Sequence, residues 1–217
     1  MTAIVCAAHA DDEIIGVGGT IAKLAKKEDV FVIIFSYGAN IAGRVSSLPL
    51  MMSEEELTKR RVFESKKAGD ILGVKETYFL GLRGINLKKE FDSTKRQLLI
   101  SLINKHSPDK LFFHSNKDTH PDHLFVNRVI NEILPQIKSK PTIYTYQVNL
   151  FDFSEKDVKV VFDISDEEFK LKMKAYQVFK SQKIWTEWWF YKPMMLFKMF
   201  YFGKKAGVKY AEYFYSE

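Results

Sequence analysis

Two clusters of histidine and acidic residues stand far apart in the sequence. The first is HADDE at residues 9–13, and the second is DTHPDH at residues 118–123. Two imidazoles and a carboxylate form the donor set of an open catalytic zinc site, in which the remaining position is left to water. A second carboxylate could accept a proton from that water, and a further histidine could stabilise an oxyanion or protonate a leaving nitrogen. Together the clusters contain the groups needed for metal-assisted hydrolysis of an amide.

Apolar runs that alternate with helical patterns predict the elements that must position these clusters. The apolar runs predict buried strands at residues 2–8, 30–35, 77–80, 110–114, 142–148 and 158–164. Helices are expected from about Gly19, over 53–70 with a capping box at Ser53 and a stop at Gly73, from Asp92, from Pro121, and over 166–181.

This alternation predicts a single α/β domain with a Rossmann-like, doubly wound, mostly parallel sheet and helices on both faces. In the strand order 3-2-1-4-5, the first and fourth strands are neighbours, and ligands bind beyond their carboxyl ends. The two clusters follow these strands, one after Ala8 and the other after His114. We therefore expect the clusters to meet at this edge of the sheet.

Length and composition favour an ordinary globular protein. The chain has 217 residues, of which 46% are hydrophobic and 28% charged, and it suits one domain over residues 1–217. Its single cysteine, Cys6, excludes a disulfide framework and a cysteine-based zinc cluster. The net charge of +6 modestly favours anionic partners, but no basic tail suggests nucleic-acid binding. Met1 leads into no long apolar run, so we expect a cytoplasmic protein. Peripheral association with the inner face of the membrane is the alternative location.

The same clusters resemble a known family. AHADDE at 8–13, followed by GGT at 18–20, closely resembles the AHPDDE…GG motif of the PIG-L/LmbE-like zinc N-deacetylases, and DTHPDH matches their D-x-H-x-D-H motif. The similarity extends over nearly the whole chain. The further matches are Arg61-x-x-Glu64-x-x-x-Ala68, FDIS at 162–165, Lys174-Ala175, Ser181-Gln182 and Gly207-x-x-Tyr210-Ala211-Glu212-x-Phe214.

The resemblance implies a metal centre in which His9, Asp12 and His123 hold Zn²⁺. Fe²⁺ or another divalent cation would suit the same nitrogen and oxygen donors. Asp11 would be the general base that acts on the metal-bound water. Ala10 replaces the usual proline of the motif, which removes a restraint on φ but no catalytic atom.

The resemblance also implies roles around the metal. His120 would stabilise the tetrahedral oxyanion or act as the acid, with Asp122 orienting it. Arg61 matches a position that contacts substrate, and His114 and Asp118 are expected to line the substrate pocket.

The implied reaction removes the N-acetyl group from an N-acetylglucosamine derivative and releases acetate and a free amino sugar. One alternative is a deacylase of another N-acyl conjugate, such as a thiol glycoside or a lipid-linked sugar. A second is a catalytically idle protein that binds sugar or metal, although the retention of Asp11 and His120 argues against it. Relatives often form trimers or hexamers, so a homo-oligomer is also expected.

Two other segments invite different interpretations. Gly16-Val17-Gly18-Gly19 follows a strand, as a dinucleotide-binding loop would, but the last glycine position of that motif is Ile21 and no acid ends the second strand. We therefore expect these glycines to permit close packing, and we expect no dinucleotide cofactor. Ile184–Lys205 is rich in aromatic residues and interleaved with lysines. It is expected to begin a C-terminal segment, 184–217, that completes the pocket, forms a subunit interface or contacts a membrane surface.

Overall fold

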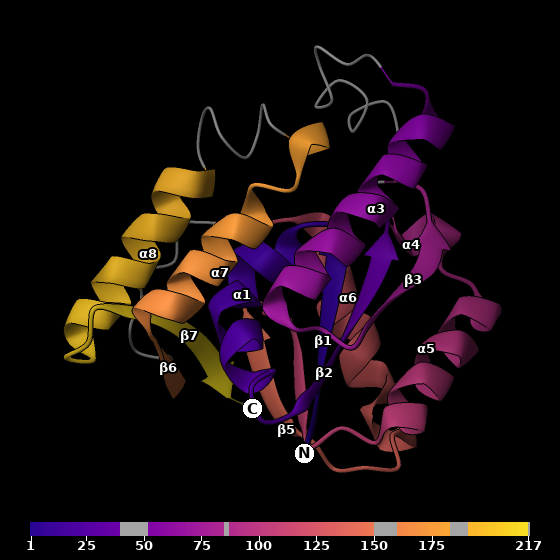
Figure 1. Cartoon of the computed structure of the whole chain (residues 1–217). Coiled ribbons are helices and arrows are strands. Elements are labelled where there is room, and N and C mark those ends of the chain that lie inside the picture. The colour runs from indigo at the N-terminus through magenta and orange to yellow at the C-terminus, as the bar shows by residue number, and fades with distance from the viewer. Residues whose placement is uncertain (40–51, 85–86, 150–159, 183–190, 217) are drawn as a thin grey trace.

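The computed structural model describes residues 1–39, 52–84, 87–149, 160–182 and 191–216. Its seven strands form one sheet in the order β3-β2-β1-β4-β5-β7-β6 (Figure 1). The strands are β1 (Thr2–His9), β2 (Asp29–Ser36), β3 (Glu76–Leu82), β4 (Lys110–His114), β5 (Thr142–Tyr146), β6 (Val160–Ile164) and β7 (Tyr210–Ser216). The helices are α1 (Asp12–Leu24), α3 (Glu54–Leu72), α4 (Leu87–Glu90), α5 (Ser93–His106), α6 (Pro121–Ile133), α7 (Asp166–Tyr176) and α8 (Tyr191–Lys205), with short 3₁₀ turns η1 (Leu134–Gln136) and η3 (Lys180–Gln182).

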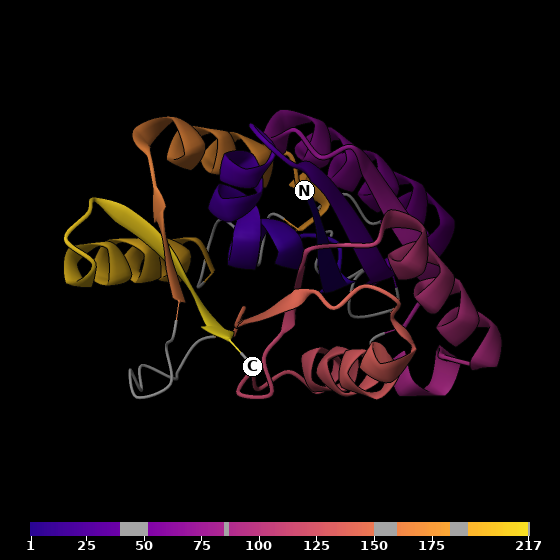
Figure 2. The ribbon, with the colours of Figure 1, turned by 90° about the horizontal axis from the view of Figure 1, so that it is seen from below.

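The predicted fold class and winding order are confirmed. Strands β1 to β5 pair in parallel, and β7 runs antiparallel to both β5 and β6. Side chains of β1 alternate between two hydrophobic cores: Val5 joins the core under α1, α3, α7 and α8, whereas Cys6 joins the core under α5 and α6. Figure 2 shows α1 and α7 on one side of the sheet and α6 on the other.

The helix boundaries follow local capping chemistry. Ser53 forms the predicted capping box with Glu56, and Gly73 ends α3 in the left-handed conformation, at φ 83°. Asp92 caps α5, and Pro121 occupies the first turn of α6. These residues satisfy the backbone groups that a helix leaves open at its ends.

The structure corrects two predicted helices and adds elements that no sequence pattern indicated. Helix α1 begins at Asp12 rather than near Gly19, because the Asp11 carbonyl accepts the N–H groups of Ile14 and Ile15 as soon as β1 ends. Helix α7 stops at Tyr176 rather than continuing to residue 181, and the chain then forms η3. Helix α4, helix α8 and strand β7 were not predicted, and the last two form the C-terminal part of the described chain.

The role predicted for residues 184–205 stays a prediction. Residues 184–190 lie outside the described part of the chain, and α8 begins just after them. The outer face of α8 exposes Phe197 and Phe200, whose exposed fractions are 52% and 47%. Among the described residues, every helix is too short or too polar to cross a bilayer.

Candidate metal centre

The two polar clusters meet where β1 and β4 end. The strands lie side by side in parallel, with Ala3 opposite Lys110 and Val5 opposite Phe112. The segments that follow β1 and β4 therefore leave the sheet at the same edge. The ring centroids of His9 and His123 are 5.6 Å apart, and those of His9 and His120 are 5.1 Å apart. Side chains separated by more than a hundred positions in the sequence therefore share one site.

The imidazoles of the two predicted ligand histidines face a single carboxylate oxygen at the centre of this site, and Nε2 of His114 lies 3.4 Å from the same oxygen. Oδ2 of Asp12 lies 3.4 Å from Nδ1 of His9 and 3.2 Å from Nε2 of His123. One ligand atom from each of these residues lies within 4.8 Å of the other two. All three side chains are largely removed from solvent, the most accessible being His9 at 14%. Such a donor set fits a divalent ion of the zinc or iron type.

Each of these imidazoles has another carboxylate on its far ring nitrogen. Oδ2 of Asp122 lies 3.2 Å from Nε2 of His9, and Oδ1 of Asp118 lies 3.0 Å from Nδ1 of His123. A carboxylate in this position fixes the ring orientation and favours an unprotonated inner nitrogen when a metal is bound. The two histidines are supported alike, although His9 ends strand β1 and His123 lies in the first turn of helix α6.

Two overlapping groups could also be considered as metal sites, namely His9 with His120 and Asp122, and His114 with Asp118 and His123. In the second of these, two of the candidate donor atoms are already bound by backbone N–H groups. Nε2 of His114 accepts the Ala8 N–H at 3.0 Å, and Oδ2 of Asp118 accepts the N–H groups of Val148 and Asn149. In the first group, the backbone N–H of Leu87 already donates to Oδ1 of Asp122.

The structure places His114 and Asp118 behind the centre, whereas the resemblance predicts that they line the substrate pocket. The His114 ring stacks on the His123 ring at a centroid separation of 3.9 Å and is fully buried. Burial and the neighbouring His123 lower the pKa of His114 to about 4, so its ring is neutral near pH 7. Asp118 is 4% exposed. Both residues pack against His123 and shape the position of its ring.

Asp11 adopts a rare backbone conformation beside the centre. Its φ is 120° and its ψ is −26°, and its exposed fraction is 8%. Burial and the charge of Asp12 raise the pKa of Asp11 to about 8. Glu13 accepts the Asp11 N–H through Oε2 at 3.0 Å.

His120 is the cap of α6 and faces the same space. Its Nδ1 accepts the backbone N–H of Asp122 at 3.1 Å, which leaves Nε2 as the position of the proton in the neutral ring. Burial and the charge of His123 lower the pKa of His120. The resemblance predicts that Asp122 orients His120, but the structure differs: the Asp122 carboxylate faces His9, and only its backbone contacts His120.

Arg61 enters from α3 at the end of β2. Its Nη1 donates to the carbonyls of Tyr37 and Gly38, at 2.8 and 2.6 Å, and the residue is 3% exposed. Gly38 has φ 60°, and a side chain at that position would collide with the guanidinium. The charge of Arg61 also acts on the Asp11 carboxylate and lowers its pKa, against the larger effect of burial.

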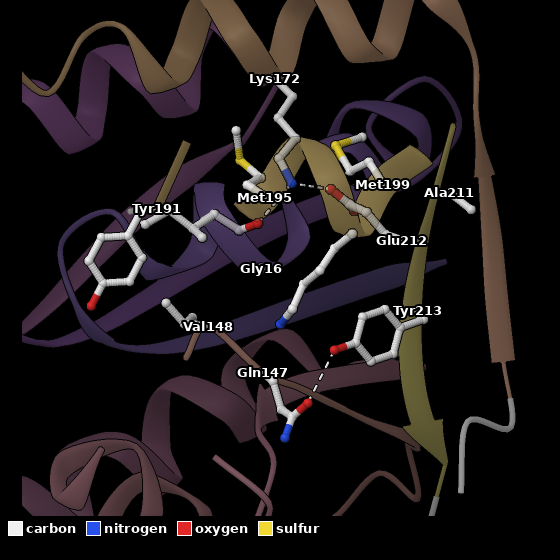
Figure 3. Close-up of a pocket in the computed structure, with 12 residues that line it drawn as sticks. Gly16, Gln147, Val148, Lys172, Tyr191, Met195, Met199, Ala211, Glu212 and Tyr213 are labelled. Carbon is white, nitrogen blue, oxygen red and sulfur yellow. Dashed lines mark hydrogen bonds and ion pairs between the residues drawn. The ribbon is translucent and has the colours of Figure 1, made fainter. Parts of the chain in front are cut away.

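Lys172 and Glu212 form a buried ion pair that lies against helix α1. The pair lines a cavity of about 30 Å³ between α1, α7, α8 and β7 (Figure 3). Nζ of Lys172 lies 2.6 Å from Oε1 of Glu212 and donates to the Ile15 carbonyl at 2.8 Å. Glu212 accepts the N–H groups of Gly19 and Thr20. Glu212 stands in the closing motif of the resemblance without a predicted role, and no sequence pattern indicated Lys172.

These contacts explain the glycine-rich start of α1. A side chain on Gly16 would collide with the Tyr146 ring, and one on Gly19 would come within 3.1 Å of Oε1 of Glu212. The predicted role in close packing is confirmed.

Three comparisons with known proteins bear on this site. The family model described as PIG-L: GlcNAc-PI de-N-acetylase matches residues 4–134. The chain is 28% identical to diacetylchitobiose deacetylase from Thermococcus kodakarensis, over 94% of this chain and 78% of that protein.

Solved structures are similar over the whole chain. N,N'-diacetylchitobiose deacetylase from Pyrococcus horikoshii superimposes with a TM-score of 0.79 at 26% identity and covers 100% of this chain and 83% of its own. The 4-carboxy-2-hydroxymuconate hydratase GalB from Pseudomonas putida gives a TM-score of 0.81 at 22% identity, covering 99% and 95%. Since GalB is named for a different reaction, the shared architecture alone does not select the chemistry.

Proposed function

The chain belongs to the PIG-L family, the GlcNAc-PI de-N-acetylases, and on this premise we propose that it hydrolyses the N-acetyl group of an N-acetylglucosamine-type sugar derivative. The products are acetate and a free amino sugar. The similarity to two proteins named as diacetylchitobiose deacetylases supports this substrate class. The observation that carries the proposal is the convergence of His9 and His123 on Asp12, with Asp11 next to them.

In this proposal His9, Asp12 and His123 hold the metal through Nδ1, a carboxylate oxygen and Nε2. Zinc is proposed because two imidazoles and one carboxylate are a donor set of catalytic zinc sites, and Fe²⁺ suits the same donors. When bound, such an ion supplies Lewis acidity toward an amide carbonyl and lowers the pKa of water.

Asp11 is the proposed general base. A buried carboxylate whose pKa is raised towards neutrality accepts a proton from water more readily than an exposed one, although the charge of a bound cation would oppose the rise. Attack of the water oxygen on the acetyl carbon leaves the proton on Asp11. The same group then delivers it to the amide nitrogen as the carbon–nitrogen bond breaks, so that acetic acid and the amine are formed without a further proton donor, and the acid then ionises to acetate.

His120 is the proposed oxyanion stabiliser. Because its Nδ1 accepts a backbone N–H, its neutral ring carries the proton on Nε2 and can donate a hydrogen bond from there. Its lowered pKa keeps the ring neutral near pH 7. A fixed donor of this kind stabilises the charge that develops on the carbonyl oxygen during attack.

Asp118 and Asp122 are proposed to hold the rings of His123 and His9, and Arg61 retains its proposed place at the substrate. The first assignment replaces the expected substrate contact of Asp118, since that carboxylate lies on a ligand histidine. His114 joins it as a packing residue behind His123.

The test is an acetate-release screen over N-acetylglucosamine, diacetylchitobiose and other N-acetyl glycosides, with metal analysis of protein purified without chelator. We expect one divalent ion per chain and acetate release from at least one glycoside. His123→Ala should lose metal and activity together, whereas His106→Ala, which alters a histidine stacked on Phe31 far from the site, should lose neither. Metal binding without acetate release from any glycoside would favour an idle sugar- or metal-binding protein.

A further inference from the structure

We infer that Gln182 is a positioning residue that holds the peptide between Ala10 and Asp11 and thereby fixes the proposed catalytic base. The inference rests on the proposed function for its kinetic consequence. Its structural basis is independent of the reaction. The side chain of Gln182 binds the backbone of the segment at the end of β1, residues 9–11, which we call the metal loop.

The conformation of Asp11 requires such support. Within the described residues, only Asp11 and Ser107 combine a side chain with positive φ. Ser107 lies in the left-handed region that often follows a helix, at φ 43° and ψ 62°, whereas Asp11 at φ 120° and ψ −26° lies outside it. A backbone of this kind is strained and persists only where its surroundings determine it.

Both polar groups of the peptide between Ala10 and Asp11 are bound. The N–H of Asp11 donates to Oε2 of Glu13, and Nε2 of Gln182 donates to the Ala10 carbonyl. The orientation of this peptide plane sets φ of Asp11, so a rotation that relaxed φ would break both hydrogen bonds. Glu13 lies only two residues further along the chain, in the first turn of α1. Gln182 lies 172 positions away in the sequence, so its hydrogen bond ties this peptide to a separate part of the structure.

Gln182 is itself held in a buried frame. Its neighbour Ser181 is fully buried and donates to the Glu64 carboxylate twice, from its N–H at 3.1 Å and from its hydroxyl at 2.6 Å. Nε of Arg60 donates to the same carboxylate at 2.8 Å. Because Glu64 is fully buried on α3, the turn η3 is anchored to a helix that packs beside the site.

The side chain of Gln182 acts through the backbone of another residue. Ala10 separates the two metal-loop residues His9 and Asp11, and unlike proline it leaves its own φ free to rotate. The hydrogen bond from Gln182 supplies a restraint on this segment that the residue type does not. Loss of that donor should shift the Asp11 carboxylate while leaving the side chains of the metal ligands in place.

The test removes the donor at nearly constant side-chain length with Gln182→Met. We expect kcat to fall by about 10–100-fold, the scale associated with small misplacements of a catalytic group, with KM and metal content unchanged. Gln177→Met is the matched control, because it makes the same substitution at an exposed position five residues earlier and should leave kcat unchanged.

Gln182→Glu gives a second readout with the native shape. Its carboxylate would repel the Ala10 carbonyl at high pH, whereas the protonated carboxyl group at low pH can donate to it. The ratio of its kcat to that of the parent should therefore rise as pH falls, while the ratio for Gln182→Met should stay flat. A merely structural loss would give two flat profiles.

Amide hydrogen exchange supplies a readout that does not depend on turnover. In Gln182→Met, exchange at the Asp11 N–H should accelerate by at least 10-fold, while exchange at Val5 in the middle of β1 should not change. Unchanged exchange at Asp11, or kcat within twofold of the parent, would overturn the inference. If the parent protein released no acetate from any substrate, the proposed function would fail, and the exchange experiment would still decide whether Gln182 holds the loop.

Discussion

Oδ1 of Asp118 lies 3.0 Å from Nδ1 of His123, while Nε2 on the other side of the same ring lies 3.2 Å from Asp12. Asp118 is itself held by three backbone N–H groups, those of His120, Val148 and Asn149. The carboxylate therefore joins the loop after β4 to the end of β5 and orients the proposed ligand between them.

Asp118→Asn should weaken metal binding by about 10–100-fold, because an amide supports the imidazole less well than a carboxylate. The expected order of metal affinity is parent, then Asp118→Asn, then His123→Ala. Competition with a calibrated chelator measures this affinity. Asp70→Asn, an exposed substitution on α3, serves as the control and should bind like the parent. Unweakened binding in Asp118→Asn would contradict the role given to this carboxylate.

Asp11→Asn should separate metal binding from turnover. We expect metal content to stay at the parent level and kcat to fall roughly 10²–10⁴-fold, the range for loss of a general base. Metal analysis and initial rates of acetate release on the same preparation measure both quantities. A variant that kept its full rate would rule out Asp11 as the base.

Metal affinity should rise with pH. Burial lowers the pKa of His123, but the charges of Asp12 and Asp118 outweigh it and raise this pKa to about 10 in the metal-free protein. A cation must displace the proton, so apparent affinity should increase by up to about tenfold per pH unit between pH 6 and 9 for this group. Calorimetry in buffers of different ionisation enthalpy measures the protons released. Affinity that did not depend on pH would contradict a protonated His123 in the free protein.

Glu212→Ala should destabilise the fold strongly. It leaves the buried ammonium of Lys172 unpaired, together with the N–H groups of Gly19 and Thr20, and removal of one partner from a buried ion pair costs about 3–5 kcal/mol in the free energy of unfolding. Urea unfolding followed by circular dichroism measures the loss.

Two companion variants isolate the charge. The double variant Lys172→Met/Glu212→Leu should be less destabilised than Glu212→Ala, since no lone charge remains in the core. Asp166→Ala breaks an exposed pair with Lys209 and should leave the unfolding midpoint near that of the parent. If the double variant had a lower free energy of unfolding than Glu212→Ala, packing rather than charge would dominate the stability of this region.

Local patterns in the sequence were sufficient for most of the fold. Continuous apolar runs predicted β1, β2 and β4, because strands buried on both faces need apolar side chains throughout. Capping residues located the starts of α3, α5 and α6. The start of α1 was misplaced because the glycines looked like a loop, whereas they lie inside a helix against Tyr146 and Glu212.

The sequence by itself determined which residue types gather after β1 and β4, and the winding rule determined that they would meet. Only the tertiary structure decided which carboxylate serves which ring: Asp122 lies on His9 rather than His120, and Asp118 lies on His123. It also brought Gln182 to Ala10 and Lys172 to Glu212. Hydrophobic periodicity records which face of an element is buried, but the pairing of buried polar groups depends on how distant elements pack, and no local pattern encodes that geometry.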